Sequence, residues 1–123
     1  MSLGYGGSAR IELQDEKTVM YSYMAYDLND PKYRNSHREY DGLITISKDA
    51  LPAAKPQRSR KSISLDLDCA QLFSCGAITV DNSRFCWKFT SGGVGMIARK
   101  IVFKLLRIYQ EEGQLPSVVG YHV

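Results

Sequence analysis

The chain has 123 residues, of which 44% are apolar and 24% are charged. This size and composition suit one compact domain spanning residues 1–123, because two domains would each be too small and because the composition argues against long disordered segments. The formal net charge of +3 is modest, but acids outnumber bases in the first fifty residues and later basic residues cluster, so charge is separated along the chain. The Gly-rich residues 1–7 are expected to be disordered or derived from a tag.

Cysteine usage and hydropathy predict a soluble, cytoplasmic protein without a membrane segment. Cys69, Cys75 and Cys86 cannot all pair within one chain, and none forms a CxxC motif, so free thiols are expected. No run approaches eighteen consecutive apolar residues, and no charged-then-apolar leader opens the chain.

Alternating side chains predict a first hairpin. Ile11 and Leu13 alternate with polar neighbours, Asp15 and Glu16 interrupt the pattern, and it resumes on the residues Val19, Tyr21 and Tyr23. The opposite face of the second strand carries Met20, Met24 and Tyr26. Because neither face is polar, both are expected to be covered, one by a helix and the other by a loop or a second subunit.

The middle of the chain predicts two long loops and two further strands. Residues 27–40 mix Asp, Asn, Pro and Ser without a period, and residues 48–61 contain Pro52 and Pro56, so both segments read as loops. Alternation over 43–47 and over 63–67 predicts a strand in each segment.

A helical turn and a second hairpin are expected next. Residues 69–75 fit either one helical turn ended by Gly76 or a bent continuation of the preceding strand. Ile78 and Val80, a polar turn, and then the aromatic residues Phe85, Trp87 and Phe89 predict a hairpin with an aromatic face.

The clearest pattern is a helix over residues 94–111. Its aliphatic stripe recurs at three- and four-residue steps and is widened by Val102, Leu106 and Tyr109; the stripe itself consists of Val94, Ile97, Ala98, Ile101, Leu105 and Ile108. The tail 117–123 is apolar enough to add an edge strand or to pack down. The expected fold is α+β, with a mainly antiparallel sheet of five or six strands packed against this C-terminal amphipathic helix.

The basic side of that helix is a candidate partner contact. Met96 and Phe103 fall among cations and away from the stripe, so each is either covered by the tail or exposed to a partner. The predicted contact residues are Met96, Phe103, Lys100, Lys104 and Arg107.

Two weaker candidates would bind anions. A basic loop could bind nucleic-acid phosphates, although a solvated surface loop is the simpler reading; its residues are Lys55, Arg58, Arg60 and Lys61. Gly92, Gly93 and Gly95 could present helix N-terminal amides to a phosphate, but the run lacks the Gly-Lys-Ser/Thr ending of a P-loop, and glycines are common at tight corners.

The titratable residues predict no catalytic or metal site and no cofactor. His37 and His122 lack metal-ligand spacing, and the loop around His37, Asp27 and Asp30 reads better as polar surface. Cys75 or Cys86 paired with a histidine is the nucleophile alternative, yet buried cysteine behaves mostly as a small apolar residue.

The expected function is therefore a non-enzymatic binding or assembly module that contacts an unknown protein or a second copy of itself. The alternatives are a weak nucleic-acid-binding protein using the basic loop and helix face, and a small enzyme or phosphate binder using the Gly-rich turn.

Overall fold

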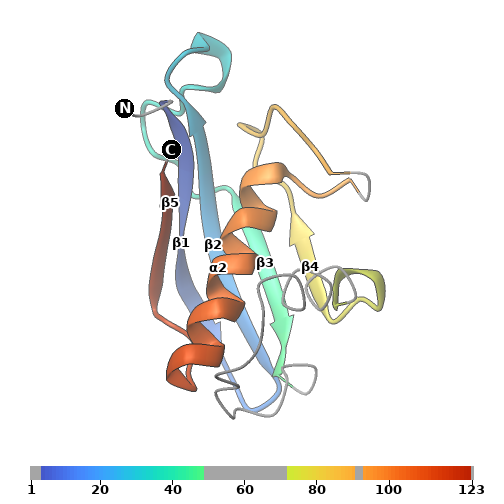
Figure 1. Ribbon diagram of the computed structural model, residues 1–123. Helices are drawn as coiled ribbons and strands as arrows, with labels where there is room; N and C mark the ends of the chain where they lie inside the picture. The colour runs from blue at the N-terminus through green and yellow to red at the C-terminus, as the bar shows by residue number, and fades with distance from the viewer. Residues whose placement is uncertain (1–3, 49–71, 91–92, 123) are drawn as a thin grey trace.

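The computed structural model describes residues 4–48, 72–90 and 93–122. In them, a five-stranded antiparallel sheet carries one long helix across one face, which confirms the expected α+β fold (Figure 1). The strands are β1 (Tyr5–Gln14), β2 (Thr18–Asp27), β3 (Gly42–Ser47), β4 (Ile78–Asp81) and β5 (Val118–His122), in the order β4-β3-β2-β1-β5. The helix is α2 (Met96–Glu112), and a short 3-10 turn, η1 (Pro31–Tyr33), follows β2. None of the described helices is long and apolar enough to cross a membrane.

The predicted first hairpin is β1 and β2, joined by a turn that Asp15 holds. Its carboxylate accepts the amides of Lys17 at 2.8 Å and Thr18 at 2.7 Å, and these bonds lower the pKa of Asp15. A bulge between Ile11 and Leu13 shifts the register by one residue. Leu13 therefore pairs with Met20 and is 54% exposed, although strict alternation would have placed it on the same face as Ile11.

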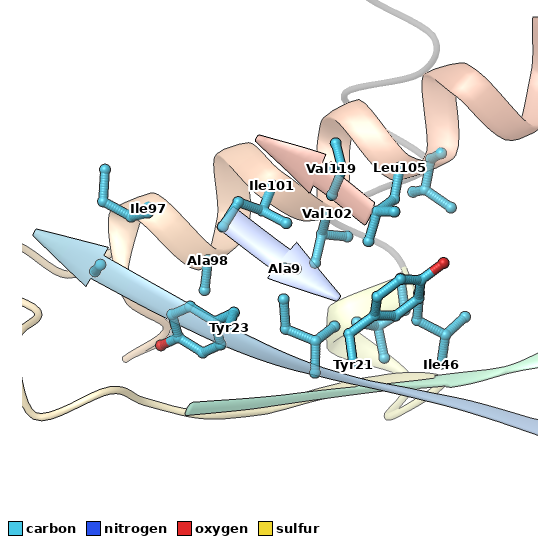
Figure 2. Close-up of a cluster of buried hydrophobic side chains, with 14 of the residues drawn as sticks. Ala9, Tyr21, Tyr23, Ile46, Ile97, Ala98, Ile101, Val102, Leu105 and Val119 are labelled. Atoms are coloured by element: carbon cyan, nitrogen blue, oxygen red, sulfur yellow. The ribbon is translucent and has the colours of Figure 1, made fainter. Parts of the chain in front are cut away.

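The core lies between the sheet and α2 (Figure 2). The strands contribute alternate side chains, and the fully buried set includes Val19, Tyr21, Tyr23, Ile44, Ile46 and Ile78. The helix contributes Ile97, Ala98, Ile101, Val102, Leu105 and Leu106. Ile108, which the periodicity also assigns to the stripe, is only partly buried at its edge. Each fully buried aliphatic side chain stabilises the fold by about 1.5–3 kcal/mol.

The second face of β2 is covered by the loop after it. Tyr40 shares a 2.6 Å hydrogen bond with Ser8 Oγ. The buried Asn35 donates to Ala25 O at 3.1 Å, and the guanidinium of Arg38 lies 4.5 Å from the centre of the Tyr26 ring. The prediction that both faces are covered is confirmed for Met24 and Tyr26, which are buried, whereas Met20 is only half-buried; the cover on this face is a loop, one of the two alternatives.

The predicted second hairpin is only half correct. β4 forms, but residues 85–89 make no strand, and Phe89 takes part only in an isolated bridge to Gly95. Polar contacts direct the chain after β4 away from a second strand. The buried Tyr23 hydroxyl accepts the Ser83 amide at 2.7 Å, and Asp41 accepts the Ser83 hydroxyl at 2.5 Å. Trp87 accordingly packs against rings from other segments, Tyr5 at 5.7 Å and Tyr33 at 6.2 Å between centroids.

The segment before β4 is helical where the structure describes it. Residues 72–74 form a helical turn, and Gly76 follows with a positive φ of 80°, so the helical alternative holds for these residues. The loop expected over 48–61, beyond Lys48, and the strand expected over 63–67 lie outside the described residues.

The tail forms the edge strand β5, antiparallel to β1, from the pair Gly6 and His122 to the pair Arg10 and Val118. Residues 5–7 are consequently part of β1, so the expectation that residues 1–7 are disordered is wrong for them; residues 1–3 lie outside the described part of the chain. The Tyr21 hydroxyl donates to Pro116 O at 2.5 Å and fixes the path from helix to strand.

Candidate binding groove between α2 and β5

A shallow groove of about 440 Å³ runs between the basic side of α2 and the edge strand β5. Its lining consists of Lys100, Phe103, Lys104, Arg107, Ile108, Glu111 and Tyr121. Four of the five contact residues predicted from the sequence are therefore brought together here. The fifth, Met96, is partly buried against the core and does not line the groove.

The way in which α2 ends explains why β5 lies beside it. Gly113 adopts a left-handed conformation with φ 79°, and its amide donates to Tyr109 O, which ends the helix. The chain then passes Pro116, where Tyr21 holds it, and enters β5. This short return places Tyr121 opposite Phe103 and Ile108 across the groove.

The charges in the groove are unequal. It contains three cations and one carboxylate, and Glu111 is paired with Arg107 at 3.4 Å. Lys104 Nζ donates to the backbone carbonyl of Gly120 at 2.5 Å. Lys100 has no hydrogen-bond or ion-pair partner among the described residues. The groove thus carries a net positive charge on an apolar and aromatic base.

The apolar part of the groove is only half-covered. Phe103, Ile108 and Tyr121 are each partly buried and pack against the core. Partial burial raises the pKa of the Tyr121 hydroxyl, so that group is uncharged at neutral pH. For Phe103, neither of the two sequence alternatives holds in full, because the ring is neither fully covered nor fully exposed.

The backbone of β5 borders the same groove. Ile11 N donates to Ser117 O at 2.8 Å, and in an antiparallel pair the hydrogen-bonded positions alternate. Val119 and Tyr121 therefore exchange bonds with β1, while the amides and carbonyls of Val118, Gly120 and His122 point away from it. Among the described residues no strand pairs with this outer side. The sequence left an edge strand as one of two alternatives for the tail, but it did not show that the tail pairs with β1 or which of its amides point outward.

The Gly-rich turn differs from an open anion cradle. Gly93 takes a left-handed φ of 81°, as a tight corner requires. The Gly95 amide donates to Asn82 Oδ1 at 2.7 Å and the Met96 amide donates to Lys88 O at 2.9 Å, so two amides at the helix start already have protein partners. Gly92 lies outside the described residues.

The other polar candidates have structural partners. His122 Nδ1 shares a 2.7 Å hydrogen bond with the Tyr26 hydroxyl, while His37 is exposed in the loop. Cys86 is buried 3.5 Å from the Tyr23 hydroxyl, and burial raises the pKa of its thiol, which disfavours the nucleophilic thiolate. Within the described ranges no three His, Cys, Asp or Glu side chains gather as metal ligands. The basic loop with Lys55, Arg58, Arg60 and Lys61 lies outside those ranges.

Comparison of the chain with protein-family models, curated proteins and solved structures finds no match.

Proposed function

We propose that this protein is a non-enzymatic binding module that contacts a partner protein through the groove between α2 and β5. The observation that carries the proposal is the position of Phe103: a half-buried aromatic ring in a concave site, surrounded by Lys100, Lys104 and Arg107. An aromatic anchor ringed by polar groups is the usual arrangement of an interface hot spot.

A photo-crosslinking side chain at position 103 tests the proposal. Benzoylphenylalanine replacing Phe103 should give a discrete protein adduct in cells that express the full chain, because the ring would lie inside the interface. The matched control is the same replacement of Leu28, an exposed apolar residue in the loop after β2 (46% exposed), which should give no such adduct. Identical adducts from both positions would contradict a specific groove contact.

Nucleic acid is the alternative partner, through the basic loop and the helix cations Lys100, Lys104 and Arg107. In that case the adduct at position 103 should disappear after nuclease treatment. The groove itself favours protein, because its base is apolar and aromatic, with Phe103, Ile108 and Tyr121, and because it is bordered by the backbone of β5, whose spacing of donors and acceptors a nucleic acid does not match. A phosphate ligand at the Gly-rich turn is a further alternative, in which the amides of Gly95 and Met96 would have to leave their present acceptors.

A further inference from the structure

We infer that the groove takes an acidic, extended peptide segment of another protein, which adds to the sheet as a sixth strand beside β5. This inference rests on the proposed binding function and names the chemistry of the partner. It combines two features that lie next to each other, the outer backbone edge of β5, with which no strand of the described part of the chain pairs, and the positively charged groove above it.

The backbone edge specifies an extended peptide. Val118, Gly120 and His122 direct their amides and carbonyls outward, at the two-residue spacing that a neighbouring strand matches. A nucleic acid cannot reproduce this alternation of donors and acceptors. Val118 is 65% exposed, so the start of the edge is accessible.

The side-chain directions join the edge to the groove. Residues directly opposite each other in neighbouring strands share a face of the sheet. Tyr121 points into the groove, so the residues of an added strand that lie level with Val119 and Tyr121 would also point toward α2. There they would meet Phe103 and Ile108, which favour an apolar residue, and the cations, which favour Asp or Glu.

Lys104 links the two features. In the free protein its ammonium group caps Gly120 O, an outward carbonyl that the incoming strand needs. When a peptide amide replaces it there, the ammonium group is released beside the bound strand, where an acidic side chain can receive it. Acidic character in the peptide thus offsets the loss of the existing Lys104 contact, whereas a neutral peptide would leave that charge without a partner.

The same charges disfavour a second copy of this chain as the occupant. Pairing β5 with β5 about a two-fold axis would bring the Lys104 side chains of both copies to one seam, with Lys100 and Arg107 behind them. Like charges so placed repel, and edge lysines are a known device against such pairing. An acidic partner is instead attracted by these cations.

The experiment begins with a random peptide library displayed on phage and selected on the full chain. The expected consensus alternates acidic residues with apolar or β-branched ones. A labelled peptide of that consensus then serves as the probe for binding. Failure to enrich any peptide, or a basic consensus, would overturn the inference.

A pair of variants at one position tests the backbone edge. Val118→Pro removes an outward amide that makes no bond to β1, and proline is tolerated at the first residue of a strand. It should weaken peptide binding roughly tenfold, whereas Val118→Ala, which keeps the amide, should stay within about twofold of the parent. Equal affinity of both variants would contradict strand addition.

Hydrogen exchange gives a readout that does not depend on a variant folding. The bound peptide should slow amide exchange at Val118, Gly120 and His122, while Val119 and Tyr121, already bonded to β1, should change little. Uniform slowing of amide exchange along β5, or no slowing, would contradict strand addition. If Phe103 crosslinks to a protein but this alternation is missing, the binding function stands and only the strand addition fails.

Charge is tested in the same assay. Lys100→Glu should weaken binding of the acidic peptide. Lys17→Glu, an equal charge change in the exposed β1–β2 turn, should leave its binding unchanged. Displacement of the peptide by a uridine oligonucleotide would show that the groove prefers nucleic acid. A dimer of the parent chain that Val118→Pro converts to monomer would assign the edge to a second copy. Either result overturns the inference.

Discussion

At the scale of single residues, the buried Tyr23 of β2 contacts two other segments, the start of β3 through its ring and residues 83–86 through its hydroxyl. The hydroxyl accepts the Ser83 amide at 2.7 Å and lies 3.5 Å from Cys86 Sγ, while Gly42 packs so closely that an added Cβ would stand 2.2 Å from the Tyr23 ring. None of these neighbours is near Tyr23 in sequence. This explains why the alternation of Phe85, Trp87 and Phe89 predicted a strand that does not form: the competing polar contacts are invisible in a local pattern.

Replacing Tyr23 by Phe should destabilise the fold by about 1–3 kcal/mol, because the buried Ser83 amide loses its acceptor. Burial raises the pKa of Tyr23 and of Cys86, and raises that of Tyr21 to about 12. Groups with raised native pKa values support stability fully below their unfolded values, about 8.5 for Cys and about 10 for Tyr, and lose that contribution as the pH rises further. Urea titrations near pH 7 and about pH 10.5 should therefore show that the free energy of unfolding falls less between these two pH values in Tyr23→Phe than in the parent. An equal loss in both would contradict the assignment.

The thiols should differ in reactivity. Cys75 is exposed and Cys86 is buried, and both are free. Iodoacetamide should label Cys75 quickly in the native protein and Cys86 only slowly, because burial and a raised pKa both limit the thiolate. In denaturant without reductant all three cysteines, including Cys69, should react, as mass spectrometry can count. Two thiols that remain protected would indicate a bridge.

At the scale of elements, the helix was predictable because its side chains repeat with the helical period. The six buried residues of α2 all lie on the predicted stripe or its widening, and the observed ends differ from the expected ones by two residues or fewer. Within α2, Ile108 is the stripe residue that is only partly buried, because it lines the groove. The bulge in β1 could not be predicted, because one inserted residue leaves an alternating pattern looking regular.

Alanine substitutions along α2 should follow these positions. Ile101→Ala should cost about 2–5 kcal/mol, as Ile101 is fully buried, and Ile108→Ala should cost less because its side chain is partly exposed. Lys100→Ala, on the opposite side, should change stability by no more than about 0.5 kcal/mol. Chemical denaturation of the three variants checks the order, and equal costs at Ile101 and Ile108 would show that the groove side is buried more deeply.

At the scale of the whole molecule, the candidate site was half predictable. The cations and Phe103 stood out because they repeat on one side of a helix, so their grouping followed from period alone. The contribution of Tyr121 and of the outward amides of β5 could not be predicted from the sequence. The tail lies beside α2 because it pairs with β1, a strand from the other end of the chain.

Charge separation predicts how the chain should behave toward nucleic acid. If Lys55, Arg58, Arg60 and Lys61, with the groove cations, displace about four to seven counterions from duplex DNA, the log–log salt slope should be near −4 to −6, with little affinity left at physiological ionic strength. Binding of a protein partner that depends on Phe103 should instead persist as salt rises and weaken strongly in Phe103→Ala. A salt series with labelled DNA and RNA separates the two, and no binding at low salt removes the nucleic-acid alternative.

The pairing of β1 with β5 has a consequence for how the protein folds. β1 cannot gain its second neighbour until β5 has been made, because the two strands come from opposite ends of the sequence. The largest loop in the topology must close at that moment, a step whose entropic cost tends to slow folding. A ribosome-bound chain would hold the β1–β2 hairpin early yet expose one side of β1 throughout synthesis. Until β5 arrives, that side is an open template for another strand, and a chaperone that shields extended backbone would be most useful during this interval.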